Sequence, residues 1–375
     1  MGIEQTLMPS PEAWLARARP DDPVFFFCPL RLAQVAARFL SGFPGLVSYA
    51  VKANPAPEMI DGLVAAGIRA FDVASPAEMA LVRAHCPEAV LHYHNPVRSE
   101  AEIAAGQAQG CTSWSVDRRS ELEKLRHLPR GTEIAVRLKL PVTGAAYDFG
   151  SKFGADPALA AALLRRVVEM GFTPSLTFHP GTQCRTPEPW ARYIQAAADV
   201  ARAAGVTLHR LNVGGGFPSD RGEGHPDLEA IFATIAIAAR AAFASPPELV
   251  CEPGRGLCAE AFLLVLRVKA VEEAAVFLND GIYGGMAEWR DLGPMARLRV
   301  ISSEGLPRGG ACRDRVVFGP TCDSLDRLPD PVALPEAIRE GDYIVFEGMG
   351  AYSRALVTGF NGYGARRIVR MSAAC

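Results

Sequence analysis

Lysine is scarce in this chain of 375 residues, and Lys52 stands where an amine could do chemistry. The chain has 34 arginines but only five lysines, and Lys52 lies within YAVKAN (49–54), at the end of an apolar run. A buried lysine is driven toward its neutral form, which can form a Schiff base with a carbonyl compound, whereas a guanidinium stays charged. The alternative is a surface lysine with its stem on apolar residues. We expect a desolvated, reactive Lys52.

Two glycine-containing motifs could bind a phosphate. The run GGG (214–216) directly follows the apolar segment LNV, and its unhindered backbone N–H groups can form an anion-binding nest. EPGR (252–255) lies one predicted strand later, where Arg255 could reach the same phosphate. We expect these two motifs to form one phosphate site.

The carboxylate of Glu252 adds a third chemical function. It could keep a pyridine nitrogen protonated, so that the ring withdraws electrons from a substrate carbon. A Schiff-base lysine, a phosphate site and this carboxylate together predict pyridoxal 5′-phosphate (PLP) as the cofactor. His179, in TFHPGTQ, could lie against the face of the ring; a core or capping histidine is the alternative.

These residues must be positioned by the secondary structure, which the sequence predicts as short strands that alternate with alanine-rich helices. The predicted strands are 46–51, 69–73, 89–93, 113–116, 133–138, 174–179, 207–213 and 248–252. Eight such repeats within about 250 residues are typical of an α/β fold of the TIM (β/α)8 barrel type. We favour this barrel over a doubly wound sheet, which is the competing arrangement.

Catalytic groups of such a barrel come from the carboxyl ends of its strands. Polar residues and glycines crowd these positions in the sequence. They are Lys52, Asp72, His94, Asn95, Asp117, Arg137, His179, Gly214, Gly215, Gly216 and Glu252. Of these, we expect Asp117 to be only the N-cap of a helix.

A second domain is predicted from about residue 259, where strands follow one another without helices between them. These strands are 261–271, 275–280, 297–302, 314–319, 341–347 and 365–371. The segment PVFFFCPL (23–30) is expected to join them. We therefore predict a barrel over 30–258 and an all-β domain built from 1–29 and 259–375.

Composition excludes several classes of protein. A net charge of −2 provides no basic surplus for nucleic acid. The nine cysteines are scattered and contain no C-x-x-C pair, which indicates reduced thiols in a cytoplasmic protein and no metal site. The longest apolar stretch, 231–239, is too short to span a membrane.

Ten motifs in order resemble those of the fold-type III PLP-dependent decarboxylases, especially the ornithine decarboxylases. They are YAVKAN, FDVASPAE (71–78), KFG (152–154), FHPGTQ (178–183), GGGFP (214–218), EPGR, NDGIYG (279–284), GPTCDSLD (319–326), FEGMGAY (346–352) and FNGYG (360–364). The resemblance implies an alanine-racemase-like barrel with a C-terminal β-domain. It also implies a homodimer with active sites shared between subunits.

The resemblance assigns roles to individual residues. Lys52 would bind the cofactor covalently, Glu252 would contact the pyridine nitrogen and His179 would stack on the ring. Cys322, from the other subunit, would protonate the carbon that has lost carbon dioxide. The remaining cofactor-binding residues would be Asp72, Arg137, Thr182, Gly215, Gly216, Gly254, Arg255 and Tyr352, and Glu78 would help to order the pocket around Lys52.

Substrate choice is expected to depend on two acids, Asp280 and Asp323, which in the ornithine enzymes correspond to carboxylates that receive the distal ammonium. Paired carboxylates suit a buried ammonium, whereas diaminopimelate also presents a distal carboxylate and needs a cation. Tyr283 and Phe360 would complete the substrate pocket. We therefore expect the conversion of L-ornithine to putrescine.

The chain departs from the family pattern at several positions. Thr182 replaces the usual serine, Asn212 the common aspartate and Ser324 a glycine, and segment 286–293 differs from the eukaryotic ornithine decarboxylases. Lysine, diaminopimelate or an unusual amino acid therefore stays an alternative substrate. Racemisation and a non-catalytic role like that of antizyme inhibitor are further alternatives; Cys322 disfavours the first, and the intact Lys52 and Glu252 disfavour the second.

Overall fold

The structure is a computed structural model, and it describes residues 4–5, 10–140 and 152–372. The chain forms two compact units. One contains residues 36–218 and 226–257, and the other contains residues 1–35, 219–225 and 258–375. The short segment 219–225 thus leaves the first unit and returns to it. The domain bounds expected from the sequence, 30–258 and 1–29 with 259–375, remain a prediction.

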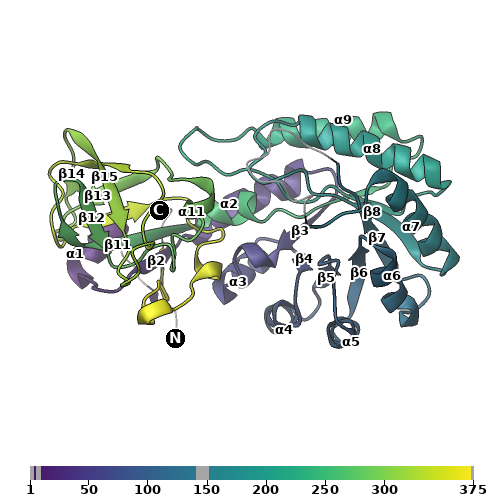
Figure 1. Ribbon diagram of the computed structural model, residues 1–375, viewed down its shortest axis with the longest axis horizontal. Coiled ribbons are helices and arrows are strands. Elements are labelled where there is room, and N and C mark those ends of the chain that lie inside the picture. The colour runs from purple at the N-terminus through teal and green to yellow at the C-terminus, as the bar shows by residue number, and fades with distance from the viewer. Residues whose placement is uncertain (1–3, 6–9, 141–151, 373–375) are drawn as a thin grey trace. The chain divides into compact units, whose positions relative to one another are not determined.

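The first unit is a closed barrel of eight parallel strands, with helices on its outside (Figure 1). This confirms the predicted TIM barrel and excludes the doubly wound sheet. The strands, in order around the barrel, are β3 (Leu46–Ala50), β4 (Ala70–Val73), β5 (Val90–Tyr93), β6 (Cys111–Val116), β7 (Glu133–Arg137), β8 (Thr173–Thr177), β9 (Arg210–Asn212) and β10 (Glu248–Cys251), which pairs with β3. Strand β4 is buried at every position, as expected for a strand covered on both faces.

Local sequence determines where several barrel helices begin. Ser75, Ser99 and Asp156 each accept a hydrogen bond from the backbone N–H of the third residue of the helix that follows, and Ser99 also forms a capping box with Glu102. The helices of this unit are α2 (Pro29–Gly42, which begins in the other unit), α3 (Pro57–Ala65), α4 (Pro76–His85), α5 (Glu100–Ala108), α6 (Arg119–Lys124), α7 (Pro157–Glu169), α8 (Glu188–Ala204), α9 (Leu228–Ala242) and α10 (Arg255–Cys258). Short 3-10 turns are η1 (Val51–Ala53) and η2 (Leu125–His127).

The second unit is built on a ten-stranded sheet, which confirms the predicted β-domain. Its strands are β1 (Glu4–Gln5), β2 (Val24–Phe27), β11 (Phe262–Val271), β12 (Ala275–Leu278), β13 (Leu298–Ile301), β14 (Pro307–Arg308), β15 (Cys312–Phe318), β16 (Val332–Pro335), β17 (Tyr343–Phe346) and β18 (Arg367–Arg370). Strand β2 pairs with both β11 and β18, so the two ends of the chain meet in one sheet.

An apolar core holds this sheet together. Trp14, from α1 (Pro11–Ala18), packs edge-on against Phe26 of β2, and Val265, Val345 and Val369 from three other strands join the same cluster. The short helical segments of this unit are η3 (Ala259–Ala261), α11 (Trp289–Leu292), η4 (Arg354–Leu356) and η5 (Phe360–Gly362).

Two sequence expectations are tested directly by these elements. Cys28, after β2, is disulfide-bonded, so the prediction of reduced thiols throughout the chain is wrong at this position. Over the residues that the structure describes, no helix is both long enough and apolar enough to cross a membrane.

Candidate active site

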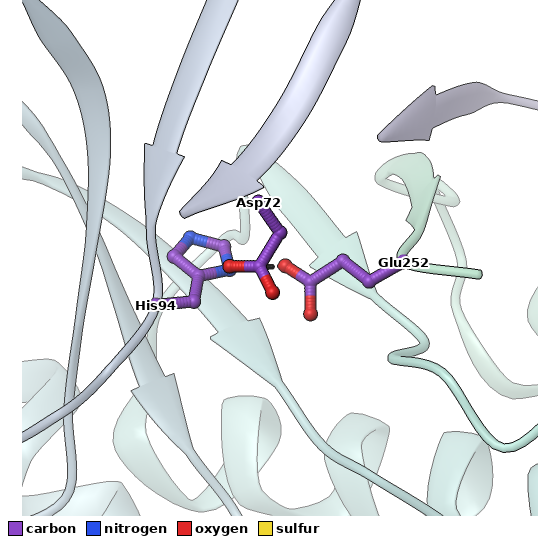
Figure 2. A group of neighbouring side chains, drawn as sticks. All are labelled: Asp72, His94 and Glu252. Carbon is purple, nitrogen blue, oxygen red and sulfur yellow. Dashed lines mark hydrogen bonds and ion pairs between the residues drawn. The ribbon is translucent and has the colours of Figure 1, made fainter. Parts of the chain in front are cut away.

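A buried carboxylate cluster lies at the carboxyl ends of the barrel strands. Asp72 is on β4, His94 follows β5 directly and Glu252 follows β10 directly. One ligand-type atom from each of the three residues lies within 4.8 Å of the others (Figure 2). The closed barrel therefore brings together three side chains that are up to 180 positions apart in the sequence.

The centre of the cluster is a short hydrogen bond between His94 and Glu252. Nδ1 of His94 lies 2.5 Å from Oε1 of Glu252, and their side chains are 7% and 11% exposed (Figure 2). Asn212, at the end of β9, donates a second hydrogen bond from Nδ2 to the same oxygen, at 2.5 Å. Its Oδ1 accepts the N–H of Gly214, which fixes the direction of the amide.

The protonation states of the two carboxylates diverge. Burial alone would raise the pKa of Glu252, but the adjacent His94 and the hydrogen bonds from His94 and Asn212 lower it to about 2. Burial and the negative charge of Glu252 raise the pKa of Asp72 to about 7. Glu252 therefore keeps its charge at neutral pH, whereas Asp72 holds its proton far more readily.

Hydrogen bonds within the protein engage both ring nitrogens of His94. Nδ1 faces the Glu252 carboxylate oxygen at 2.5 Å, and Nε2 lies 3.0 Å from the Ser113 hydroxyl. A metal ion bound to His94 would have to displace one of these hydrogen bonds.

Lys52 lies on η1 at the same rim, but it is exposed. The prediction that the strand end would desolvate it is wrong, because β3 ends at Ala50 and the following turn lifts Lys52 out of the buried run. Its charge partly offsets the rise in the pKa of Asp72 and helps to lower the pKa of His179. Glu78 senses the same charge; burial raises the pKa of Glu78, and the carboxylate accepts the Ala74 N–H at 2.7 Å.

The GGG run lies against His179. Gly214 and Gly216 have φ values of +70° and +86°, which disfavour side chains. A Cβ on Gly215 would be 3.0 Å from Nε2 of His179 and from the Glu252 carbonyl oxygen. Burial and the charges of Lys52 and Arg137 lower the pKa of His179 to about 3, so its ring is neutral.

The other predicted cofactor residues of the barrel unit lie on its β-α loops. Arg137 ends β7, and burial lowers the pKa of its guanidinium. Thr182 lies in the loop after β8 and is half-buried, whereas Gly254 and Arg255 are buried at the start of α10. Asp117 is not the N-cap of α6, which is Arg118; it bonds Arg118 and the Gly154 N–H instead.

The β-unit brings most of its predicted site residues together. Tyr283 donates a 2.5 Å hydrogen bond to Asp323, and its ring centre lies 5.1 Å from that of Phe360. The exposed Cys322 thiol lies 3.4 Å from Oδ1 of Asn361. The bond from Tyr283 lowers the pKa of Asp323, so this carboxylate is ionised. Tyr352, in the same unit, has a φ of +51°.

Asp280 has a different environment from Asp323. It is buried, and its carboxylate accepts the N–H groups of Gly285 and Ala365 at 2.8 and 3.2 Å. Burial raises its pKa to about 6. This side chain holds a turn together, which disfavours the predicted contact with a substrate ammonium. Asp326 has a comparable role that the sequence did not indicate, since it bonds Ile282 and Thr321.

His94 and Asn212 are the site residues whose importance the sequence understated. Each was visible as a polar residue at a strand end or as a departure from the family pattern, but neither position indicated a bond to Glu252. Only the barrel closure shows that β5, β9 and β10 direct these side chains to one point.

Comparison with known proteins gives a consistent assignment. The family described as "Pyridoxal-dependent decarboxylase, pyridoxal binding domain" matches residues 31–259. The decarboxylase flvG of Aspergillus flavus is 31% identical over 340 residues, which are 85% of this chain and 78% of that protein. Mouse ornithine decarboxylase is 28% identical over 87% of this chain and 75% of its own length.

A solved structure extends this comparison. The lysine/ornithine decarboxylase of Vibrio vulnificus in complex with putrescine is 27% identical and has a TM-score of 0.82, covering 97% of this chain and 99% of its own. For the present chain, this similarity supports the decarboxylase class and the two-unit fold.

The divergent carboxylates predict a pH-dependent stability of the cofactor-free protein. Folded Asp72 keeps its proton up to about pH 7, whereas the unfolded chain loses it near pH 4, so stability falls as pH rises between these values. The asparagine side chain in Asp72→Asn does not titrate, so this variant is expected to lose the part of the fall in stability with pH that Asp72 causes. Melting temperatures at several pH values from 4.5 to 7.5 measure it, with Asp199→Asn, an exposed position on α8, as the control. If melting temperature depends on pH in the same way in wild type and Asp72→Asn, the raised pKa of Asp72 is contradicted.

Proposed function

Because the chain belongs to the family of pyridoxal-dependent decarboxylases, we propose that it converts L-ornithine to putrescine in polyamine biosynthesis. The chain is a PLP-dependent decarboxylase of the group that acts on basic amino acids. The reaction releases carbon dioxide, and the α-carbon takes up a proton in its place. The observation that carries the choice of a diamine-forming substrate is the ionised Asp323, held by Tyr283.

The barrel rim fits PLP. Gly215 leaves no room for a Cβ beside His179, Arg255 is buried one residue after Gly254, and Lys52 provides an exposed primary amine nearby. When bound, PLP supplies an electron-withdrawing ring that accepts the electron pair left by the departing carboxylate. The glycine run and Arg255 would hold the phosphate, and Lys52 would bind the aldehyde carbon.

Glu252 and His179 have complementary properties at this site. Glu252 is a buried anion at neutral pH and would keep a proton on the pyridine nitrogen. His179 is neutral and lies against the GGG run, so it would cover the ring face without adding a competing charge. The raised pKa of Asp72 limits repulsion beside Glu252.

Recognition of the distal ammonium would depend on Asp323. An ammonium needs an ionised acceptor, and the hydrogen bond from Tyr283 both orients Asp323 and stabilises its charge. Asp280, which holds backbone N–H groups in a buried turn, is a weaker candidate for this role. Tyr283 and Phe360 would pack along the methylene chain of the substrate.

The Cys322 thiol would protonate the α-carbon after carbon dioxide leaves. Its exposure in the single chain, beside exposed Leu325 and Phe360, is consistent with a loop that meets another subunit. We infer a cytoplasmic homodimer in which Cys322 and Asp323 complete the barrel site of the partner subunit. In this arrangement neither chain alone holds a full active site.

Substrate choice can be measured directly. The PLP-loaded protein is expected to release putrescine from L-ornithine with a higher kcat/KM than it shows for L-lysine, L-arginine or meso-diaminopimelate. Asp323→Asn should raise the KM for L-ornithine about tenfold or more, because it removes a charge-assisted contact. Asp330→Asn, an exposed aspartate after the same loop, is the control. A preference for L-lysine would replace the proposed substrate, and an unchanged KM would remove Asp323 from recognition.

The shared site predicts complementation between inactive variants. Lys52→Ala and Cys322→Ala chains damage different halves of the site, so a hybrid dimer contains one intact site. Mixing equal amounts after subunit exchange should restore up to about a quarter of wild-type activity, because half the dimers are hybrids. Activity of the mixture is compared with that of each variant alone. If subunit exchange is verified and no activity returns, the sites are not shared.

A further inference from the structure

The two carboxylate oxygens of Glu252 differ in their hydrogen bonds. His94 and Asn212 both bond Oε1. Within the described part of the chain, Oε2 has no hydrogen-bond partner, and the oxygen that is not bonded to His94 points away from the imidazole (Figure 2). One oxygen is thus fixed by the protein, and the other stays available to a ligand.

His94 is itself held rigidly. Its Nε2 lies 3.0 Å from the Ser113 hydroxyl on β6, and its backbone carbonyl accepts the hydroxyl hydrogen of Ser115 at 2.8 Å. The ring of His92 stacks on it with centroids 5.5 Å apart and an interplanar angle of 13°. In the described residues neither nitrogen of His92 has a hydrogen-bond partner, so His92 acts as a flat packing surface.

The side-chain amide of Asn212 is oriented to donate to Glu252. Because its Oδ1 accepts the Gly214 N–H, only Nδ2 can face Glu252. An aspartate at this position would place an acceptor oxygen against the Glu252 carboxylate and would repel it. The amide and the imidazole are therefore two donors directed at one buried anion.

We propose that His94 is a positioning residue that, together with Asn212, holds Oε1 of Glu252 so that Oε2 is presented to the pyridine nitrogen of PLP. This inference rests on the proposed role of Glu252. It adds a function for two side chains, at the ends of β5 and β9, that would themselves not touch the cofactor. Burial lowers the pKa of His94, but the charge and hydrogen bond of Glu252, together with the charges of Asp72 and Glu133, raise it overall, which agrees with a charged donor.

The test compares PLP with an analogue in which a C–H group replaces the ring nitrogen. Dissociation constants of both compounds are measured by titration of the cofactor-free protein, so no enzyme activity is involved. Wild type should bind PLP at least about tenfold more tightly than the analogue, because only PLP can bond Oε2. His94→Ala and Asn212→Asp should reduce this ratio toward one, whereas His94→Asn, which keeps a donor near the Nδ1 position, should retain most of it.

Controls separate the possible outcomes. His85→Ala removes a comparable but exposed pair, with Asp61 at 2.7 Å, and should leave the ratio unchanged. If Glu252→Ala leaves the ratio unchanged, the proposed role of Glu252 fails and this inference fails with it. If Glu252→Ala abolishes the ratio but His94→Ala and Asn212→Asp do not, only the positioning role is overturned. Should His94→Ala fail to fold, Asn212→Asp and Ser113→Ala carry the same comparison.

Discussion

A buried negative charge is the constraint on which the barrel site depends. Glu252 can remain ionised in a low-dielectric environment only where donors compensate for the lost water, and His94 and Asn212 provide them. Glu252 and His94 directly follow β10 and β5, and Asn212 is the last residue of β9, so the contacts require a closed barrel. Formation of the fold and charging of the carboxylate are therefore coupled.

The charge on Glu252 affects the protonation of its neighbours. It raises the pKa of Asp72, which lies within the same cluster, and it makes a charged His94 more favourable. Glu252 also favours a proton on His179, but burial and the cations Lys52 and Arg137 outweigh it and lower the pKa of His179 to about 3, so its ring is neutral. One fixed anion, one neutral ring and one exposed amine thus occur at the same rim, and each matches a role proposed above for binding PLP.

The sequence predicted the positions of the strands better than the surroundings of individual side chains. Hydrophobic periodicity identified all eight barrel strands, because a buried parallel strand is a short continuous apolar run. It did not predict that Lys52 is exposed, since one 3-10 turn separates it from the buried strand. Nor did it distinguish Asp280, which holds a turn, from Asp323, which faces Tyr283. Asp280 and Asp323 differ because folding brings backbone N–H groups to the first and the Tyr283 ring to the second. The sequence likewise did not predict that Cys28 is disulfide-bonded.

The proposed decarboxylase would hold PLP at the barrel rim, and Cys322, Asp323 and Tyr283 of the β-unit would act on a basic substrate. The proposal depends most on Glu252 being an anion paired with the pyridine nitrogen. The most direct measurement is the nitrogen NMR shift of PLP labelled with ¹⁵N in the ring and bound to the wild-type protein at neutral pH. We predict the shift of a protonated pyridinium, which should be lost in Glu252→Ala. The shift of an unprotonated pyridine in the wild type would contradict the pairing of Glu252 with the ring nitrogen.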